Sequence, residues 1–124
     1  MEQLVIDAGI IADYLKGNES AVLPQIWDHY KLTVSAVTIT ELFAAKKSVE
    51  AEMNKKMVDL LTERFTVVDI NRAIAEKAAN ILRELDISLA NALVAATAIE
   101  LDSPLVTLDL GTFDLVPDLK IVDL

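Results

Sequence analysis

The chain has 124 residues, a hydrophobic fraction of 53% and a formal net charge of −9. The composition excludes a disordered protein, and the length suits one domain, residues 1–124, with its own hydrophobic core. The negative charge argues against general affinity for polyanions, and no apolar run is long enough to cross a membrane.

The chain contains no cysteine, which excludes disulfides and thiol chemistry. Glu2 stands where a secretion signal would carry basic residues. Together, these two features predict a cytoplasmic protein without a membrane segment.

The first third of the chain predicts strands and helices in alternation. Residues 4–6 are an apolar run that ends at Asp7, which is typical of a buried strand. Gly17 suits the left-handed position that closes a helix. We therefore expect a strand at 3–6, a helix at 8–16, a second helix at 19–30 and a strand at 31–35.

The rest of the chain continues this alternation. Ser35 can cap a helix that carries Glu41, and Ser88 can open a helix that is apolar nearly all round and therefore buried. We expect helices at 50–64, 72–85 and 89–101, and strands at 65–70, 105–108 and 120–122, the last two flanking a turn around Gly111 and Pro117. This order predicts an α/β fold, in which a mainly parallel central sheet carries helices on both faces.

Acidic residues follow two of the expected strands. Asp7 comes directly after the first strand, and Asp109 comes directly after the strand at 105–108. In open α/β sheets, ligands bind at the carboxyl edge of the strands, so the two acids can meet there. Glu41 is a third acid, set in a stretch of apolar and small residues. Clustered carboxylates without cysteine, in a chain with a single histidine, indicate a hard divalent cation.

Four motifs carry a resemblance to a known family. They are Ile6-Asp7, Thr40-Glu41-Leu42, the run from Leu89 to Ala98, and the run from Leu105 to Asp109 with Phe113. In this order they resemble the motifs of PIN domains, and most of all the small VapC toxins of toxin–antitoxin pairs. The resemblance spans about residues 5–122. It implies a PIN-like three-layer α/β/α fold, a magnesium or manganese site and cleavage of RNA. It also implies a cognate antitoxin protein and a homodimer.

The resemblance assigns catalytic and metal-binding roles to particular residues. It gives them to Asp7, Glu41 and Asp109, and to Asn91 at a fourth position where these toxins typically have aspartate. An asparagine keeps a carbonyl oxygen that can bind a hard cation, but it lacks the negative charge. A second departure is Ala8-Gly9, which stands where the family has hydroxyl side chains that can orient the first acid.

Each of these residues also has a purely structural interpretation. Asp7 could be a helix N-cap, Asn91 could serve only the start of its helix, and Asp109 could be a turn residue. Glu41 could lie on a solvent-exposed helix face. A catalytically weakened or silent PIN scaffold therefore remains the alternative to a metal-dependent endoribonuclease.

Overall fold

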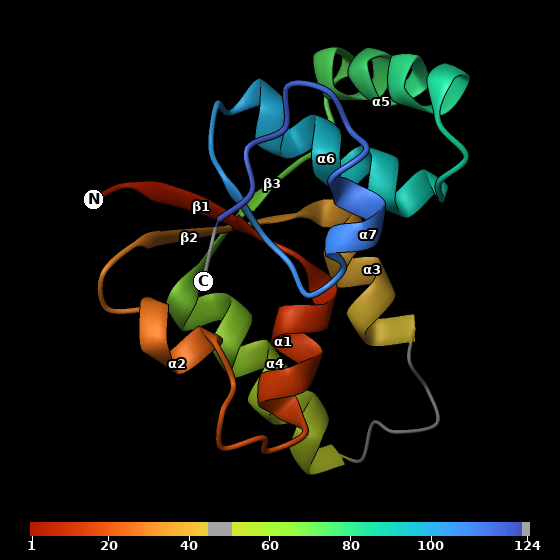
Figure 1. Cartoon of the computed structure of the whole chain (residues 1–124). Coiled ribbons are helices and arrows are strands. Elements are labelled where there is room, and N and C mark those ends of the chain that lie inside the picture. Colours follow the sequence, from red (N-terminus) through yellow and green to blue (C-terminus); the bar gives the residue numbers. More distant parts are fainter. Residues whose placement is uncertain (45–50, 123–124) are drawn as a thin grey trace.

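The computed structural model describes residues 1–44 and 51–122, and for residues 51–53 it describes the backbone alone (Figure 1). In this part of the chain, four strands form one sheet in the order β3-β2-β1-β4, and every pairing is parallel. The strands are β1 (Gln3–Ile6), β2 (Lys31–Ser35), β3 (Phe65–Val68) and β4 (Leu105–Val106). The expected parallel sheet is confirmed.

The central strand β1 is buried on both faces of the sheet. Leu4 and Ile6 belong to one hydrophobic cluster, whereas Val5 belongs to the other. Successive side chains of a strand point to opposite faces, so a continuous apolar run serves two helix layers at once. The run therefore fixes β1 between two layers of helices.

Two groups of helices cover the two faces (Figure 1). Helices α1 (Ala8–Leu15), α2 (Leu23–Ile26) and α4 (Ala51–Arg64) pack against the cluster that contains Leu4. Helices α5 (Arg72–Glu84), α6 (Leu89–Glu100) and α7 (Leu110–Phe113) pack against the cluster that contains Val5. Helix α3 (Ala36–Ala44) follows β2 and contributes Leu42 to the first cluster, while its Val37 packs against the second. The molecule is thus a three-layer α/β/α structure, as expected.

The prediction of a helix at 19–30 is wrong, because only Leu23–Ile26 is α-helical there. Before it, Asn18 forms a turn in which its side-chain oxygen accepts a hydrogen bond from the N–H of Ser20 (3.0 Å). Val22, at the N-cap, has no side-chain oxygen to support a longer helix. After α2, the N–H of His29 donates to the carbonyl of Ile26, which is turn geometry.

The chain near the last strands also differs from expectation. Strand β4 ends at Val106 and β3 at Val68, while the expected strand at 120–122 is reduced to one parallel bridge between Leu105 and Ile121. The turn expected around Gly111 is the short helix α7. The other expected helices agree to within a residue at each end, and position 50, the expected start of α4, lies outside the described residues.

Among the described residues, no helix combines the length and the apolar character that a bilayer crossing requires.

Candidate functional site

Asp7 and Asp109 both lie at the carboxyl edge of the sheet, just after β1 and β4. Glu41 lies on α3, which begins directly after β2, and Asn91 lies in the first turn of α6. Figure 1 shows α7 and α3 near the end of β1. The parallel topology therefore brings the starts of several helices to one edge.

Asp7 is buried, with 9% of its surface exposed. Its Oδ1 accepts a hydrogen bond from the backbone N–H of Ala8 (2.9 Å), so Asp7 is the N-cap of α1. Its Oδ2 accepts a hydrogen bond from the hydroxyl of Thr107 (2.8 Å). Burial raises the pKa of Asp7; the two hydrogen bonds oppose that shift, and the charge of Asp109 adds to it.

Thr107 is a residue of this site that sequence reasoning missed. Its hydroxyl donates to Asp7 and accepts a hydrogen bond from the backbone N–H of Asp109 (3.0 Å). A threonine at the end of a strand is common, so its residue type gives little signal. The available signal was its position, opposite Asp7 in the predicted parallel sheet.

Glu41 is exposed on α3, as the solvent-face interpretation expects. Its carboxyl group is nevertheless close enough to Asp7 to respond to the charge of that residue. Partial burial raises its pKa, and the charge of Asp7 raises it further. One turn earlier, Thr38 is buried, and its hydroxyl has no hydrogen-bond partner in the described part of the chain.

Asp109 and Asn91 both lie at helix starts. Asp109 is the N-cap of α7, with its Oδ1 accepting from the N–H of Thr112 (3.3 Å). The backbone N–H of Asn91 donates to the hydroxyl of Ser88 (3.0 Å), the N-cap of α6. None of the hydrogen bonds between described residues involves the side chain of Asn91. The structure thus relates Asp7 electrostatically to Glu41 and Asp109, and it shows no interaction that joins Asn91 to them.

The candidate ligand atoms at this edge are of the type that a hard cation prefers. They are carboxylate oxygens, whose mutual repulsion a divalent ion would relieve. However, within residues 1–44 and 54–122 no three side chains of Asp, Glu, His or Cys come together closely enough to hold a metal ion. The oxygen chemistry fits magnesium or manganese, but these side chains do not form a ready ligand set.

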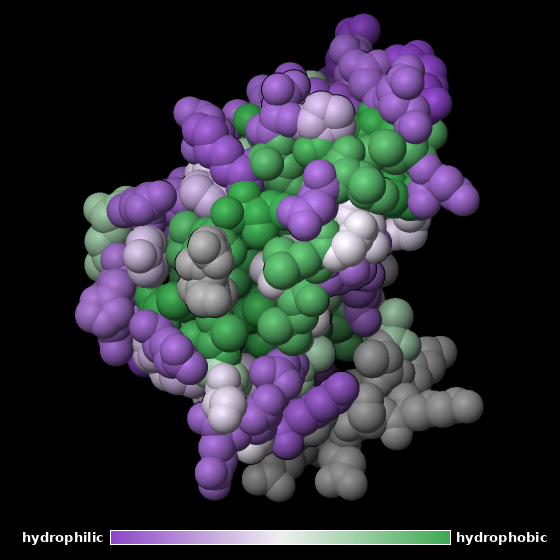
Figure 2. Space-filling view, viewed as in Figure 1, coloured by the Kyte–Doolittle hydropathy of each residue, from purple (hydrophilic) through white to green (hydrophobic). Residues whose placement is uncertain are grey.

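An apolar surface adjoins the acidic edge. A cavity of about 480 Å³ lies between the residue that precedes α2, the segment around α7 and the last described residues. Its lining residues are Val22, Thr107, Leu108, Leu110, Asp114, Ile121 and Val122. Leu108 and Leu110, which flank Asp109, are 59% and 50% exposed. Figure 2 shows apolar residues gathered on this face of the molecule. Thr107 therefore contacts both the acids and an open apolar cavity.

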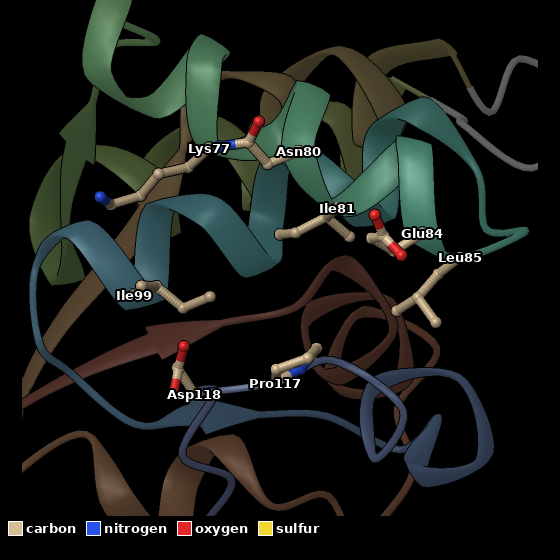
Figure 3. Close-up of a pocket in the computed structure, with 8 residues that line it drawn as sticks. All are labelled: Lys77, Asn80, Ile81, Glu84, Leu85, Ile99, Pro117 and Asp118. Carbon is tan, nitrogen blue, oxygen red and sulfur yellow. The ribbon is translucent and has the colours of Figure 1, made fainter.

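A second cavity, of about 290 Å³, lies between α5, α6 and the segment at Pro117 and Asp118 (Figure 3). Its lining combines apolar side chains such as Ile81 and Ile99 with Glu84 and Lys77. None of the four predicted site residues lines it.

The model of the PIN domain matches residues 4–119 of the chain. No curated protein is similar enough in sequence to match.

Among solved structures, a DNA-bound VapBC from Salmonella typhimurium is similar with a TM-score of 0.85 and 23% identity, covering 99% of this chain and 98% of that chain. VapBC-1 from nontypeable Haemophilus influenzae is similar with a TM-score of 0.78 and 27% identity, with coverages of 98% and 97%. A more distant match is Mycobacterium tuberculosis VapC20, a toxin that cleaves the sarcin–ricin loop. Its TM-score is 0.66 at 13% identity, with coverages of 81% and 84%.

Proposed function

The chain belongs to the PIN-domain family and is VapC-like, and from this premise we propose that it is a metal-dependent endoribonuclease toxin. It would hydrolyse phosphodiester bonds of RNA at the acidic edge of the sheet. The observation that carries the proposal is the buried Asp7, whose pKa is raised by burial and by Asp109, and whose charge in turn raises the pKa of Glu41. Acids held together at a cost to their ionised forms are typical of a site that serves a cation.

The residues would divide the work as follows. Asp7, Glu41 and Asp109 would hold the ion through their carboxylate oxygens, and Glu41 and Asp109 would also orient water. Asn91 offers a neutral oxygen, either as a ligand or to position water. When bound, magnesium or manganese supplies the positive charge that offsets the charge of the phosphate and makes water more acidic. Without that positive charge, the carboxylates would repel an RNA phosphate.

The proposed partners follow from the relatives. Similar structures from Salmonella typhimurium and Haemophilus influenzae are VapBC structures, so we propose a cognate antitoxin for this chain as well. The homodimer that we also propose rests on the resemblance of the sequence motifs alone. A basic antitoxin side chain placed among the carboxylates would be the complementary electrostatic fit. We further propose that the protein acts in the cytoplasm.

The second candidate function is a weakened or silent PIN scaffold. It is favoured by Asn91, which lacks the charge of an aspartate, and by the absence of a three-residue metal cluster within the described residues. A scaffold of this kind would bind its protein partner without cleaving RNA.

The decisive experiment measures cleavage of mixed-sequence RNA by the full chain in manganese and in EDTA. We expect cleavage in manganese only, and a loss of about a hundredfold or more in Asp7→Asn. The matched control is Asp13→Asn on the same helix, where the carboxylate accepts a hydrogen bond from the side chain of Asn18 and does not contact Thr107. If Asp7→Asn cleaved RNA as fast as the wild type, the proposed role of Asp7 in the site would be wrong. A wild-type chain that cleaves nothing in saturating manganese would establish the scaffold instead.

A further inference from the structure

We propose that Thr107 is the positioning residue of the acidic edge: its hydroxyl fixes the carboxylate of Asp7 relative to Asp109. The predicted consequence, a change in the affinity for a divalent ion, rests on the proposed function. The positioning itself rests on two hydrogen bonds of Thr107 Oγ1: it donates to Asp7 (2.8 Å) and accepts from the backbone N–H of Asp109 (3.0 Å).

The two bonds together fix the direction of the hydroxyl proton. A threonine hydroxyl has one proton to donate and two lone pairs to accept. The backbone N–H of Asp109 can only donate, so it occupies a lone pair of Thr107 Oγ1. The ionised carboxylate of Asp7 can only accept, so the proton of Thr107 is directed at its Oδ2. One hydroxyl therefore ties the side chain of one acid to the backbone of another.

The sheet holds this hydroxyl in place. Strands β1 and β4 pair in parallel with Ile6 opposite Val106, and the N–H of Asp7 donates to the carbonyl of Val106 (3.0 Å). Asp7 and Thr107 are the next residues along each strand, so they meet although they lie 100 positions apart. Thr107 is itself buried, with 7% of its surface exposed, which limits the rotamers that its side chain can adopt.

Asp7 has no side-chain donor nearby in sequence to take over this role. Its other hydrogen bond comes from the backbone of Ala8, and neither Ala8 nor Gly9 carries a hydroxyl. A carboxylate with one backbone donor can still rotate, whereas one held at both oxygens cannot. Removing a partner that orients a metal ligand typically costs ten- to a hundredfold in metal affinity.

The test compares Thr107→Val with Thr107→Ser and uses manganese binding by calorimetry as the readout. Valine keeps the shape but removes both hydrogen bonds, and we expect a ten- to hundredfold weaker affinity. Serine keeps the hydroxyl and should restore affinity to within about threefold. Thr97→Val is the matched control, because that buried hydroxyl donates to the carbonyl of Leu93 inside α6. It should leave manganese affinity unchanged.

A second readout needs no metal and separates this inference from the proposed function. In metal-free protein at fixed pH, NMR signals of the Asp7 carboxyl carbon and the Asp109 amide should both shift in Thr107→Val, and neither should shift in Thr97→Val. If Thr107→Val does not fold, Thr107→Ala takes its place. Unchanged signals, or wild-type manganese affinity in the valine variant, would overturn the positioning role. A wild-type chain that binds no manganese while the NMR shifts occur would instead overturn the proposed enzyme and leave the positioning role supported.

Discussion

Asp7 combines two roles that the sequence presents as alternatives. It caps α1 through Oδ1, and it takes part in the acidic edge through Oδ2 and through its charge. A capping carboxylate is stabilised by the positive end of the helix, which partly offsets the cost of burial. The structural interpretation of Asp7 is therefore correct, and it does not compete with the proposed function.

Asn91 is the residue at which the proposed activity can be increased. Replacing Asn91 by aspartate adds one negative charge with almost no change in size. We expect tenfold or greater gains in magnesium and manganese affinity and faster RNA cleavage, because changes of ligand charge at such sites are worth on the order of 1–3 kcal/mol. The measurements are calorimetric metal titration and cleavage at saturating manganese. Equal or slower cleavage would show that Asn91 does not limit the site and would favour the scaffold.

Glu41 should make the stability of the metal-free protein depend on pH. Its pKa is raised above the ordinary value of 4.5, so the folded state binds its proton more tightly than the unfolded state does. Stability must then fall as pH rises from about 4.5 through the higher folded pKa. Glu41→Gln removes this loss, so its melting temperature should exceed that of the wild type at pH 7 by a few degrees at most.

Two conditions check this expectation. Below pH 4 the difference between Glu41→Gln and the wild type should vanish, because the glutamate is then neutral in both states. Excess manganese should reverse its sign at pH 7, because the ion binds the folded wild type more tightly. A variant that is less stable than the wild type at pH 7 without metal would contradict a raised pKa of Glu41 in the folded state.

At the scale of the element, helices are predicted most accurately where the hydrophobic pattern is long. Helix α6 is apolar around most of its surface and begins at a capping serine, and the structure has it one residue shorter than expected. The region 19–30 contains apolar residues at helical spacing, but Asn18 forms a turn just before it, and local turn chemistry outweighs the period.

In the candidate site too, the sequence predicts some residues and misses others. Asp7, Glu41 and Asp109 could be picked out because acids in apolar surroundings are unusual. Thr107 was missed, because its residue type gives little signal and its role depends on a hydrogen bond to Asp7, 100 positions away at the end of a neighbouring strand. The helix α7 was expected as a turn, since a single helical turn is too short to show a period.

The start of α6 gives a prediction about an element. Ser88 caps this helix by accepting from the N–H of Asn91, so Ser88→Ala should cost about 1 kcal/mol of stability and free the first turn that carries Asn91. Asn71→Ala removes the equivalent cap of α5, where the side chain accepts from the N–H of Ile74 (2.9 Å). Both variants should lose similar stability in denaturant unfolding. Only Ser88→Ala should speed hydrogen exchange at Asn91 and weaken manganese binding. Equal effects of both variants on manganese would mean that the α6 cap does not support the site.

At the scale of the molecule, both the net charge and the surface disfavour binding of RNA through its phosphates. The chain carries a net charge of −9, yet its proposed substrate is a polyanion. Several basic side chains are already engaged: Arg64 pairs with Asp28, Arg72 with Glu76 and Lys120 with Asp102. The exposed Leu108 and Leu110 beside Asp109 offer apolar contact instead. An acidic centre with an apolar border is poorly suited to bind RNA through phosphates alone.

RNA binding should therefore depend on the divalent ion itself. We expect no measurable binding of single-stranded RNA in EDTA, and clear binding when magnesium is added, because the ion reverses the local charge at Asp7 and its neighbours. The control is sodium chloride at the same ionic strength, which screens repulsion without occupying the site and should restore little binding. Fluorescence anisotropy of labelled RNA measures all three conditions, and Asp7→Asn should lose the magnesium response. If sodium chloride restored binding as well as magnesium does, general screening would explain the effect. The acidic edge would then bind no ion that RNA requires.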